Sequence, residues 1–81
     1  MKVLYFSWLR ERVGVASEDV ETEAATAREL IVELVARGEH YAHAFKELGT
    51  IRVAVDQEMA DMNAPLGGAR EVAFFPPVTG G

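Results

Sequence analysis

The sequence predicts an α+β fold in which a mixed sheet of about five strands packs on one main helix. Two observations support this fold class. Segments of alternating apolar and polar residues lie near both ends of the chain and after its middle, and one capped amphipathic segment lies between them. The resulting order is β-β-α-(α)-β-β-β. With 81 residues, the chain is expected to form one domain, residues 1–81, around one modest core.

The first strand is predicted over residues 2–8. Its short apolar run lacks the length and the cleavage site of a signal peptide, so a strand is the better interpretation. Residues 9–14 then predict a short helical turn, which Gly14 closes. Alternation around Val20 predicts a second strand over residues 18–22, in a hairpin with the first.

The main helix is predicted to begin at Thr26. The spacing of Thr26 and Glu29 is that of a capping box, in which each side chain bonds the backbone amide of the other residue. Gly38 is expected to end this helix as a C-cap. A weaker helical segment follows and stops at Gly49. The predicted inner face of the main helix is formed by Leu30, Ile31, Leu34 and Val35, and that of the weaker segment by Tyr41, Ala44, Phe45 and Leu48.

The second half of the chain predicts three strands. Residues 51–56 alternate clearly, residues 57–62 form the return strand of a hairpin, and residues 70–75 form the last strand. Pro76 and Pro77 end that strand, because proline has no amide hydrogen to donate to a ladder.

Side-chain alternation assigns a face to each strand residue, since successive side chains point to opposite sides of a sheet. If the charged residues Lys2, Arg52 and Glu71 face water, the inner face consists of Val3, Tyr5, Ile51, Val53, Val55, Val72 and Phe74. The outer face then carries Leu4, Phe6, Ala54, Ala73 and Phe75. Exposed apolar patches often mark partner surfaces, so Phe6, Phe75, Leu4 and Ala73 are the predicted partner-binding residues. A one-residue shift of this alternation at a bulge is the alternative.

Composition limits the functional classes. The chain has no cysteine, which excludes a disulfide scaffold, a thiolate metal site and a cysteine nucleophile, and which agrees with a cytoplasmic location. No segment has the roughly 18 apolar residues of a membrane span. The net charge is −5 and no basic stripe is present, so no nucleic-acid partner is expected. An acidic surface suits a basic protein groove, or it simply keeps a small protein in solution.

The side chains predict no active site of the chain's own. His40 and His43 lie three residues apart but have no third ligand at a convincing spacing, so no metal site is predicted. Glu21 and Glu23 have no predicted pocket that would raise the pKa of one carboxyl group for catalysis. We therefore expect neither a metal nor a cofactor to bind this chain.

The remaining candidate is the C-terminal end of the sequence, Val78-Thr79-Gly80-Gly81. Residues 76–81 are predicted to form a flexible tail, because glycine lacks a Cβ and tolerates many backbone conformations. A thin tail of this kind could enter a narrow channel and present the α-carboxylate of Gly81 to another enzyme. The alternative is a terminus that is merely frayed.

These residues resemble a known family. Residues 74–81, Phe-Phe-Pro-Pro-Val-Thr-Gly-Gly, resemble the C-terminal signature of the small subunit of molybdopterin synthase, a ubiquitin-like sulfur carrier. Leu9-Arg10-Glu11 with Gly14 resembles the family's Leu-Arg-Glu-x-x-Gly, and residues 53–57 resemble its Val-Ala-Val-Asn stretch. Leu66 with residues 71–73 is similar to the segment before the tail. One difference is Ala69-Arg70, where the family commonly has Gly-Asp; the turn glycine is then expected at Gly68 or Gly67.

The resemblance implies a β-grasp (ubiquitin-like) fold and a role as a non-catalytic carrier subunit in molybdenum cofactor biosynthesis. It implies that an activating enzyme uses ATP to adenylate Gly81, and that a persulfide donor converts the end into a thiocarboxylate. Val78, Thr79 and Gly80 would thread into the large subunit of a heterotetramer with two large and two small subunits. The sulfur would there pass to cyclic pyranopterin monophosphate.

Three other functions remain open from the sequence. The chain could be a sulfur carrier for thiamin, cysteine or tRNA thiolation. It could be a ubiquitin-like modifier, whose tail forms an isopeptide bond to a lysine. It could also be a plain β-grasp adaptor whose Gly80-Gly81 end has no chemical role.

Overall fold

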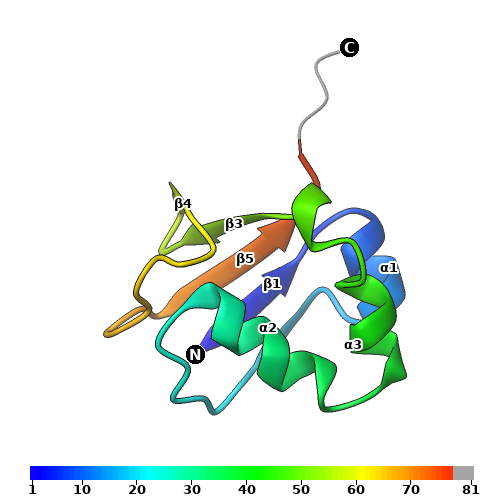
Figure 1. The fold of residues 1–81 in the computed structure, drawn as a ribbon, viewed down its shortest axis with the longest axis horizontal. Helices are drawn as coiled ribbons and strands as arrows, with labels where there is room; N and C mark the ends of the chain where they lie inside the picture. Colours follow the sequence, from blue (N-terminus) through cyan, green and yellow to red (C-terminus); the bar gives the residue numbers. More distant parts are fainter. Residues whose placement is uncertain (78–81) are drawn as a thin grey trace.

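The computed structural model describes residues 1–77, and in this part of the chain all five strands form one mixed sheet of order β2-β1-β5-β3-β4 (Figure 1). β1 and β5 are parallel, and the other neighbouring pairs are antiparallel. This confirms the predicted fold class. The strands are β1 (Lys2–Tyr5), β2 (Ser17–Asp19), β3 (Arg52–Val55), β4 (Glu58–Ala60) and β5 (Glu71–Phe75); the helices are α1 (Trp8–Val13), α2 (Ala27–Val35), α3 (Glu39–Ala44) and the short 3-10 helix η1 (Leu48–Thr50).

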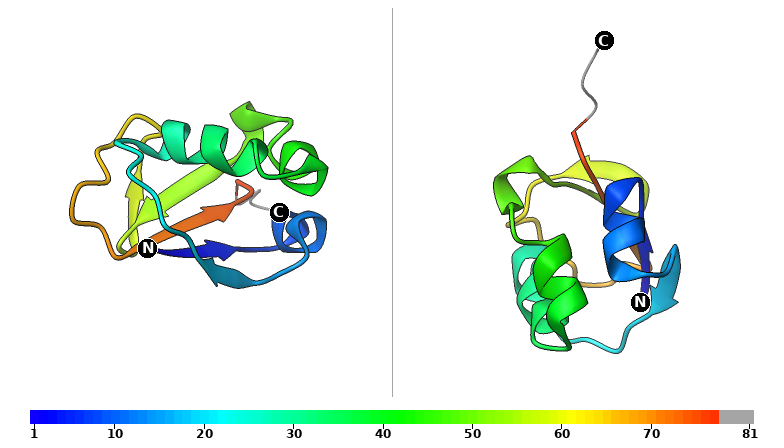
Figure 2. Two further views of the ribbon diagram at one scale, coloured as in Figure 1. Left: turned by 90° about the horizontal axis from the view of Figure 1, so that it is seen from below. Right: turned by 90° about the vertical axis from the view of Figure 1, so that its right-hand side faces the viewer.

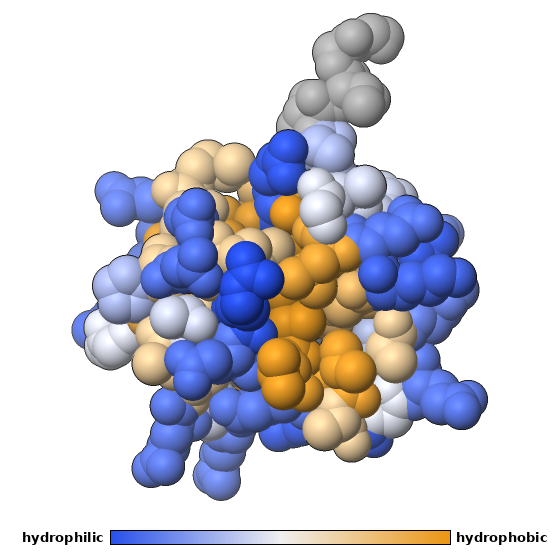
Figure 3. Space-filling model, viewed as in Figure 1, coloured by the Kyte–Doolittle hydropathy of each residue, from blue (hydrophilic) through white to orange (hydrophobic). Residues whose placement is uncertain are grey.

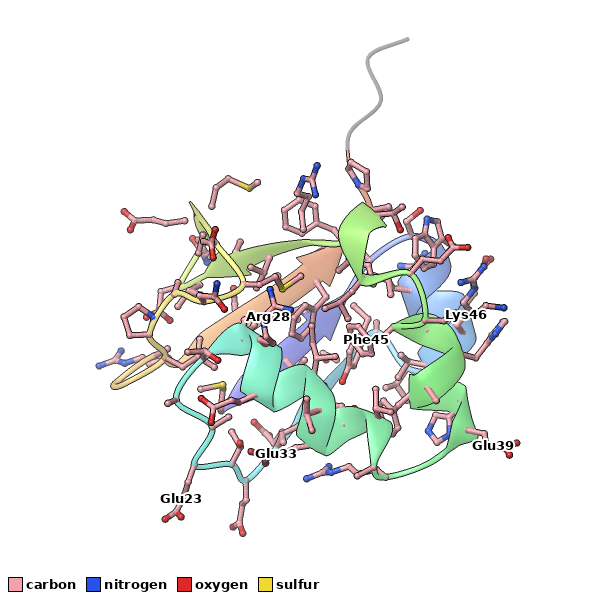
Figure 4. All side chains as sticks on the ribbon, in the orientation of Figure 1. Glu23, Arg28, Glu33, Glu39, Phe45 and Lys46 are labelled. Carbon is pink, nitrogen blue, oxygen red and sulfur yellow. The ribbon has the colours of Figure 1, made fainter. Side chains whose placement is uncertain are left out.

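The core lies between the sheet and the helices α2 and α3, which cover the same face of the sheet (Figure 2). Leu30 and Leu34 of α2 are fully buried there. Phe45, labelled in Figure 4, packs edge-on against Phe74 with ring centroids 5.1 Å apart, and against Tyr5 at 6.4 Å. These aromatic contacts attach the end of α3 to the two central strands.

Strand register confirms the predicted inner face. β5 lies between β1 and β3, so that Val72 pairs with Val3 and Phe74 pairs with Val53. All four side chains are at most 1% exposed. Lys2 pairs with Glu71 on the opposite face, as expected for alternating side chains. The alternative with a one-residue shift is therefore wrong.

The capping box of α2 is present in a modified form. The Thr26 hydroxyl accepts a hydrogen bond from the Glu29 amide at 3.2 Å, as predicted. The Glu29 carboxylate accepts from the same hydroxyl at 3.3 Å instead of from the Thr26 amide. The predicted end of the helix at Gly38 is wrong: α2 ends at Val35, because the Arg37 amide donates to Leu34 and tightens the last turn. Gly38 instead precedes α3 in an extended conformation.

The first two strands are shorter than predicted. β1 ends at Tyr5 because Ser7 adopts a positive φ of 56° and starts α1, so Trp8 is helical rather than part of the strand. Gly14 ends this helix in the left-handed region, as predicted. β2 covers Ser17–Asp19 rather than residues 18–22, and α1 connects it to β1, so the two strands do not form a tight hairpin.

The β3–β4 hairpin turns at Asp56 and Gln57, which have φ values of 49° and 70°. Asp56 is therefore a turn residue and not the last residue of a strand. Its carboxylate oxygen Oδ1 accepts hydrogen bonds from the backbone amides of Arg70 and Glu71, at 2.9 and 3.0 Å. Asp56 thus holds the hairpin turn against the first residue of β5.

The turn before β5 explains how the chain accommodates Ala69-Arg70 where the family commonly has Gly-Asp. Gly68 has a φ of +79°, a conformation that glycine adopts readily. The Ala69 amide donates to the Leu66 carbonyl at 2.9 Å and closes the turn. Of the two glycines expected to form the turn, Gly68 and Gly67, it is Gly68 that adopts the turn conformation, one residue before the position of the family's glycine.

Candidate functional site

One face of the sheet carries no helix (Figure 2), and a row of apolar residues crosses four of its five strands there. The register places Leu4 beside Ala73, Ala73 beside Ala54, and Ala54 beside Met59. The row therefore crosses β1, β5, β3 and β4. Met59 is 68% exposed, whereas the two alanines leave a low strip between the larger side chains.

Two aromatic residues lie next to this row, near the end of β5. Phe6 is 46% exposed, and Phe75 is half-buried. The Phe6 amide donates to the Phe74 carbonyl at 3.1 Å, which continues the parallel pairing one residue past β1. The structure thus brings together the four residues predicted for partner binding, Phe6, Phe75, Leu4 and Ala73, although their role in binding stays a prediction.

The row and the aromatic pair border a shallow depression of about 640 Å³, here called the sheet-face depression. Ser7, Pro76 and Pro77 close it at the end where the predicted tail begins, and Gln57 and Glu71 line it further along. Both prolines are half-buried. A partner on this face would therefore also contact the first residues of the tail. The depression is lined by Leu4, Phe6, Ser7, Ala54, Gln57, Glu71, Ala73, Phe75, Pro76 and Pro77.

Sequence reasoning missed Met59 as a candidate and did not assign Ala54 to partner binding. Ala54 was already placed on the outer face by alternation. A two-residue turn at Asp56 and Gln57 pairs Ala54 with Met59, so the hairpin register would have identified Met59.

A second depression lies on another side of the tail base. It is lined by Ser7, Trp8, Arg12, Glu47, Thr50, Pro76 and Pro77, and we call it the helix-side depression. Trp8 and Arg12 are one turn apart on α1, and the Arg12 guanidinium carbon lies 4.5 Å from the Trp8 ring centroid. Ser7, Pro76 and Pro77 belong to both depressions.

The predicted tail residues Val78, Thr79, Gly80 and Gly81 lie outside the described residues, so their proposed roles in threading and chemistry rest on the sequence. Within residues 1–77, no group of three or more His, Asp or Glu side chains could hold a metal ion. His40 and His43 are exposed, as are Glu21 and Glu23.

A partly buried hydrogen-bond network lies on the opposite side of the sheet from the sheet-face depression. The hydroxyl groups of Tyr5 and Tyr41 both donate to Glu18 Oε2, at 2.8 and 2.7 Å. Burial, followed by the hydrogen bond to Glu18, raises the pKa of both phenol groups. These tyrosines therefore stay protonated and join β1, β2 and α3; they have no proton to give up near neutral pH.

The helix-bearing side has a second apolar surface near its centre, where α2 lies (Figure 3). Val32 of α2 is 66% exposed and Val35 is 36% exposed. This surface is distant from the sheet-face depression because the sheet and the core separate them. No helix within residues 1–77 is long and apolar enough to cross a membrane.

Comparison with known proteins identifies the family. The family model described as "ThiS family" matches residues 3–81. The chain belongs to the ThiS family. A curated relative of this ThiS protein is the molybdopterin synthase sulfur carrier subunit of Escherichia coli, which is 38% identical over 81 residues, or 100% of this chain and 99% of the relative. The predicted family and the predicted role as a sulfur carrier subunit are thereby confirmed.

Two solved structures extend the comparison. SAMP1 of Haloferax volcanii, also described as small archaeal modifier protein 1, has a TM-score of 0.74 and 25% identity, covering 100% of the ThiS chain and 98% of SAMP1. A complex of subunits 1 and 2 of the molybdopterin-converting factor from Helicobacter pylori contains a similar chain, with a TM-score of 0.63, 26% identity, and coverage of 99% and 96%. Similar folds thus occur both in a named modifier and in a two-subunit complex.

Proposed function

We propose that this chain carries sulfur on the C-terminal carboxylate of Gly81 and delivers it inside a molybdopterin synthase complex. The observation that carries the proposal is the position of the apolar sheet face. It continues to Pro76 and Pro77, from which the Gly80-Gly81 end follows. A partner bound to that face has the tail next to its own surface.

The first step makes the carboxylate reactive. A carboxylate is a poor electrophile, so an ATP-dependent activating enzyme forms the acyl-adenylate of Gly81 and releases pyrophosphate. The terminal sulfur of a persulfide donor then attacks the acyl carbon and expels AMP. A thiol reduces the resulting acyl disulfide and leaves a thiocarboxylate on Gly81. In this proposal the activating enzyme binds ATP and supplies the acids and bases for these steps.

The second step delivers the sulfur. The sheet face docks on the large subunit, and Val78, Thr79 and Gly80 thread into its active site. Attack by the thiocarboxylate sulfur on cyclic pyranopterin monophosphate, followed by hydrolysis of the thioester, places sulfur on the substrate and restores the carboxylate. A dithiolene needs two sulfur atoms, so two charged carriers are used per product, in agreement with a complex of two large and two small subunits in the cytoplasm.

Docking through the sheet face is favoured by the burial of apolar surface. Leu4, Phe6, Phe75 and Met59 present apolar atoms to water, and burial of apolar surface contributes about 25 cal/mol per Å². Aromatic and methionine side chains are also enriched in protein interfaces. The small side chains of Ala54 and Ala73 leave space for a projecting side chain of the partner.

Mass spectrometry of the chain after incubation with its activating enzyme, ATP and a persulfide donor tests the proposal. The expected product is a chain whose mass reflects replacement of one terminal oxygen by sulfur, and the mass increase should disappear after addition of the large subunit and substrate. The proposal would be contradicted if the chain stayed unmodified in the complete mixture although the activating enzyme consumed ATP with a control carrier protein.

A protein modifier is the second candidate, because the chain has the same fold as SAMP1 at a TM-score of 0.74. The same activated Gly81 would then acylate a lysine of another protein. Protein conjugates that form in cells expressing the full chain, but not in cells expressing a chain without Gly81, would support this function. Thiocarboxylate without conjugates supports the sulfur carrier.

A further inference from the structure

The base of the tail is flanked by the two depressions, which share Ser7, Pro76 and Pro77. Four residues follow Pro77, and a fully extended chain of that length spans at most about 14 Å. A partner that reacts with Gly81 must therefore place its reactive group within that distance of Pro77. The mouth of a channel surrounds the segment that enters it, so its rim extends over the helix-side depression as well as the sheet face.

The helix-side depression differs from the sheet face in its chemistry. Its most prominent feature is the Arg12 guanidinium, stacked on the Trp8 ring at 4.5 Å. Arg12 also donates a long hydrogen bond of 3.5 Å to the His43 carbonyl. Neither contact neutralises the positive charge. Stacking on an aromatic ring and the contact with α3 hold this half-buried arginine in one place.

We propose that Trp8 and Arg12 form a second docking site for the large subunit, at which Arg12 binds a carboxylate on the rim of the subunit's tail channel. The inference rests on the proposed function. A partner that complements a chain of net charge −5 is basic over most of its contact surface, whereas the positive Arg12 at the base of the tail is complemented by an acidic residue. Glu47 also lines this depression, and its carboxylate repels that of the partner. Trp8 acts as a positioning residue for Arg12.

Charge variants of the full chain test the site by measuring the Kd for the large subunit. Arg12→Glu should weaken binding roughly tenfold at low salt, because a like-charge contact replaces an attractive one. The loss should shrink in high salt, which screens exposed charges. Trp8→Leu should weaken binding about threefold by releasing Arg12. Glu47→Gln should tighten binding, because it removes the repulsion.

Arg10→Glu is the matched control. Arg10 lies on the same helix, is exposed, and lines neither depression. It changes the net charge by the same amount as Arg12→Glu, so it corrects for long-range attraction. Thermal unfolding of each variant confirms that the fold is retained. If Arg12→Glu fails to fold, Arg12→Gln and Arg10→Gln replace the two charge-reversing variants, so that the net charges still match.

The outcomes separate this inference from the proposed function. Equal Kd values for Arg12→Glu and Arg10→Glu would overturn the second docking site. If Phe6→Asp weakens binding in the same experiment, docking through the sheet face still holds. A wild-type chain that does not bind the large subunit would overturn both. A selective, salt-sensitive loss at Arg12 together with tighter binding of Glu47→Gln supports the site.

Discussion

At the residue scale, Asp56 shows how a single side chain positions the candidate site. Its carboxylate accepts from the amides of Arg70 and Glu71 and so fixes the start of β5. Its own φ of 49° lies in the left-handed region, where Asp and Asn are tolerated better than other non-glycine residues. Both properties explain why this turn accepts Asp where the resemblance shows Asn.

Asp56→Ala should lower the free energy of unfolding by about 1–2 kcal/mol, because it removes two hydrogen bonds and places a Cβ-bearing residue without a polar side chain in the left-handed region. Asp56→Asn keeps an oxygen acceptor and should be nearly neutral. Urea unfolding monitored by circular dichroism measures both. An alanine variant as stable as the asparagine variant would show that these bonds do not support the turn.

The two tyrosines bound to Glu18 predict a dependence of stability on alkaline pH. Their pKa values are raised in the folded protein, mainly by burial and then by the bond to Glu18. Above about pH 10 the unfolded chain loses these phenolic protons while the folded chain keeps them. Because the unfolded state then binds fewer protons, stability is fully present below that pH and falls as pH rises.

Urea unfolding between about pH 8 and about pH 11 measures this effect. The double variant Tyr5→Phe/Tyr41→Phe should start from a lower stability but lose less of it as the pH rises. The opposite result, an equally steep loss in the double variant, would assign the alkaline sensitivity to other groups.

At the element scale, β5 separates the core from the candidate docking surface. Phe74 points inward and is fully buried, whereas the neighbouring Phe75 lines the sheet-face depression. One strand therefore carries a core residue and a residue predicted to bind a partner in adjacent positions.

Phe74→Asp should unfold the protein. Loss of a buried phenylalanine costs about 3–5 kcal/mol, a buried charge adds to that, and a domain of this size has only about 4–12 kcal/mol of stability. Phe75→Asp should leave a folded chain that binds the large subunit weakly. Circular dichroism and a binding assay on both variants test the assignment; a folded Phe74→Asp variant with weak binding would reverse it.

Alternation of side chains was enough to predict which face of each central strand is buried, because charged Lys2, Arg52 and Glu71 fix the phase. Element ends were harder to predict. Ser7 ends β1 through a backbone conformation that serine rarely adopts, and α2 ends at Val35 although a C-cap glycine was available at Gly38. Local backbone geometry sets both ends, through the positive φ of Ser7 and the hydrogen bond from the Arg37 amide to the Leu34 carbonyl. The Trp8–Arg12 stack was missed because Trp8 was predicted in the first strand, whereas the two residues lie at i, i+4 on α1. Met59 was missed because the hairpin register was not worked out from the two-residue turn.

At the scale of the whole molecule, the domain fixes where the tail begins, and the proposed function assigns the reactive group to the tail. The tail follows β5, which is paired on both sides, by β1 and by β3. Its starting point is therefore fixed relative to the sheet-face depression by two ladders of hydrogen bonds.

Deletion of Gly81 should abolish formation of the thiocarboxylate while the free energy of unfolding stays within about 0.5 kcal/mol of wild type, because Gly81 lies beyond the last strand. Addition of one alanine after Gly81 should be equally harmful, since it converts the reactive carboxylate into a peptide carbonyl. Mass spectrometry after the activation reaction checks both variants. Sulfur transfer by either one at the normal rate would contradict the carrier mechanism.

The parallel pairing of β1 with β5 also has a mechanical consequence. A force that pulls the tail away from the N-terminus acts along both strands in opposite directions, so that it shears their connecting hydrogen bonds together instead of opening them one at a time. These bonds continue past both ends of the pairing, from the Lys2 amide to the Arg70 carbonyl at 2.9 Å and from the Phe6 amide to the Phe74 carbonyl at 3.1 Å. The pairing of β1 with β5 therefore lets the domain stay folded when a partner pulls on the tail.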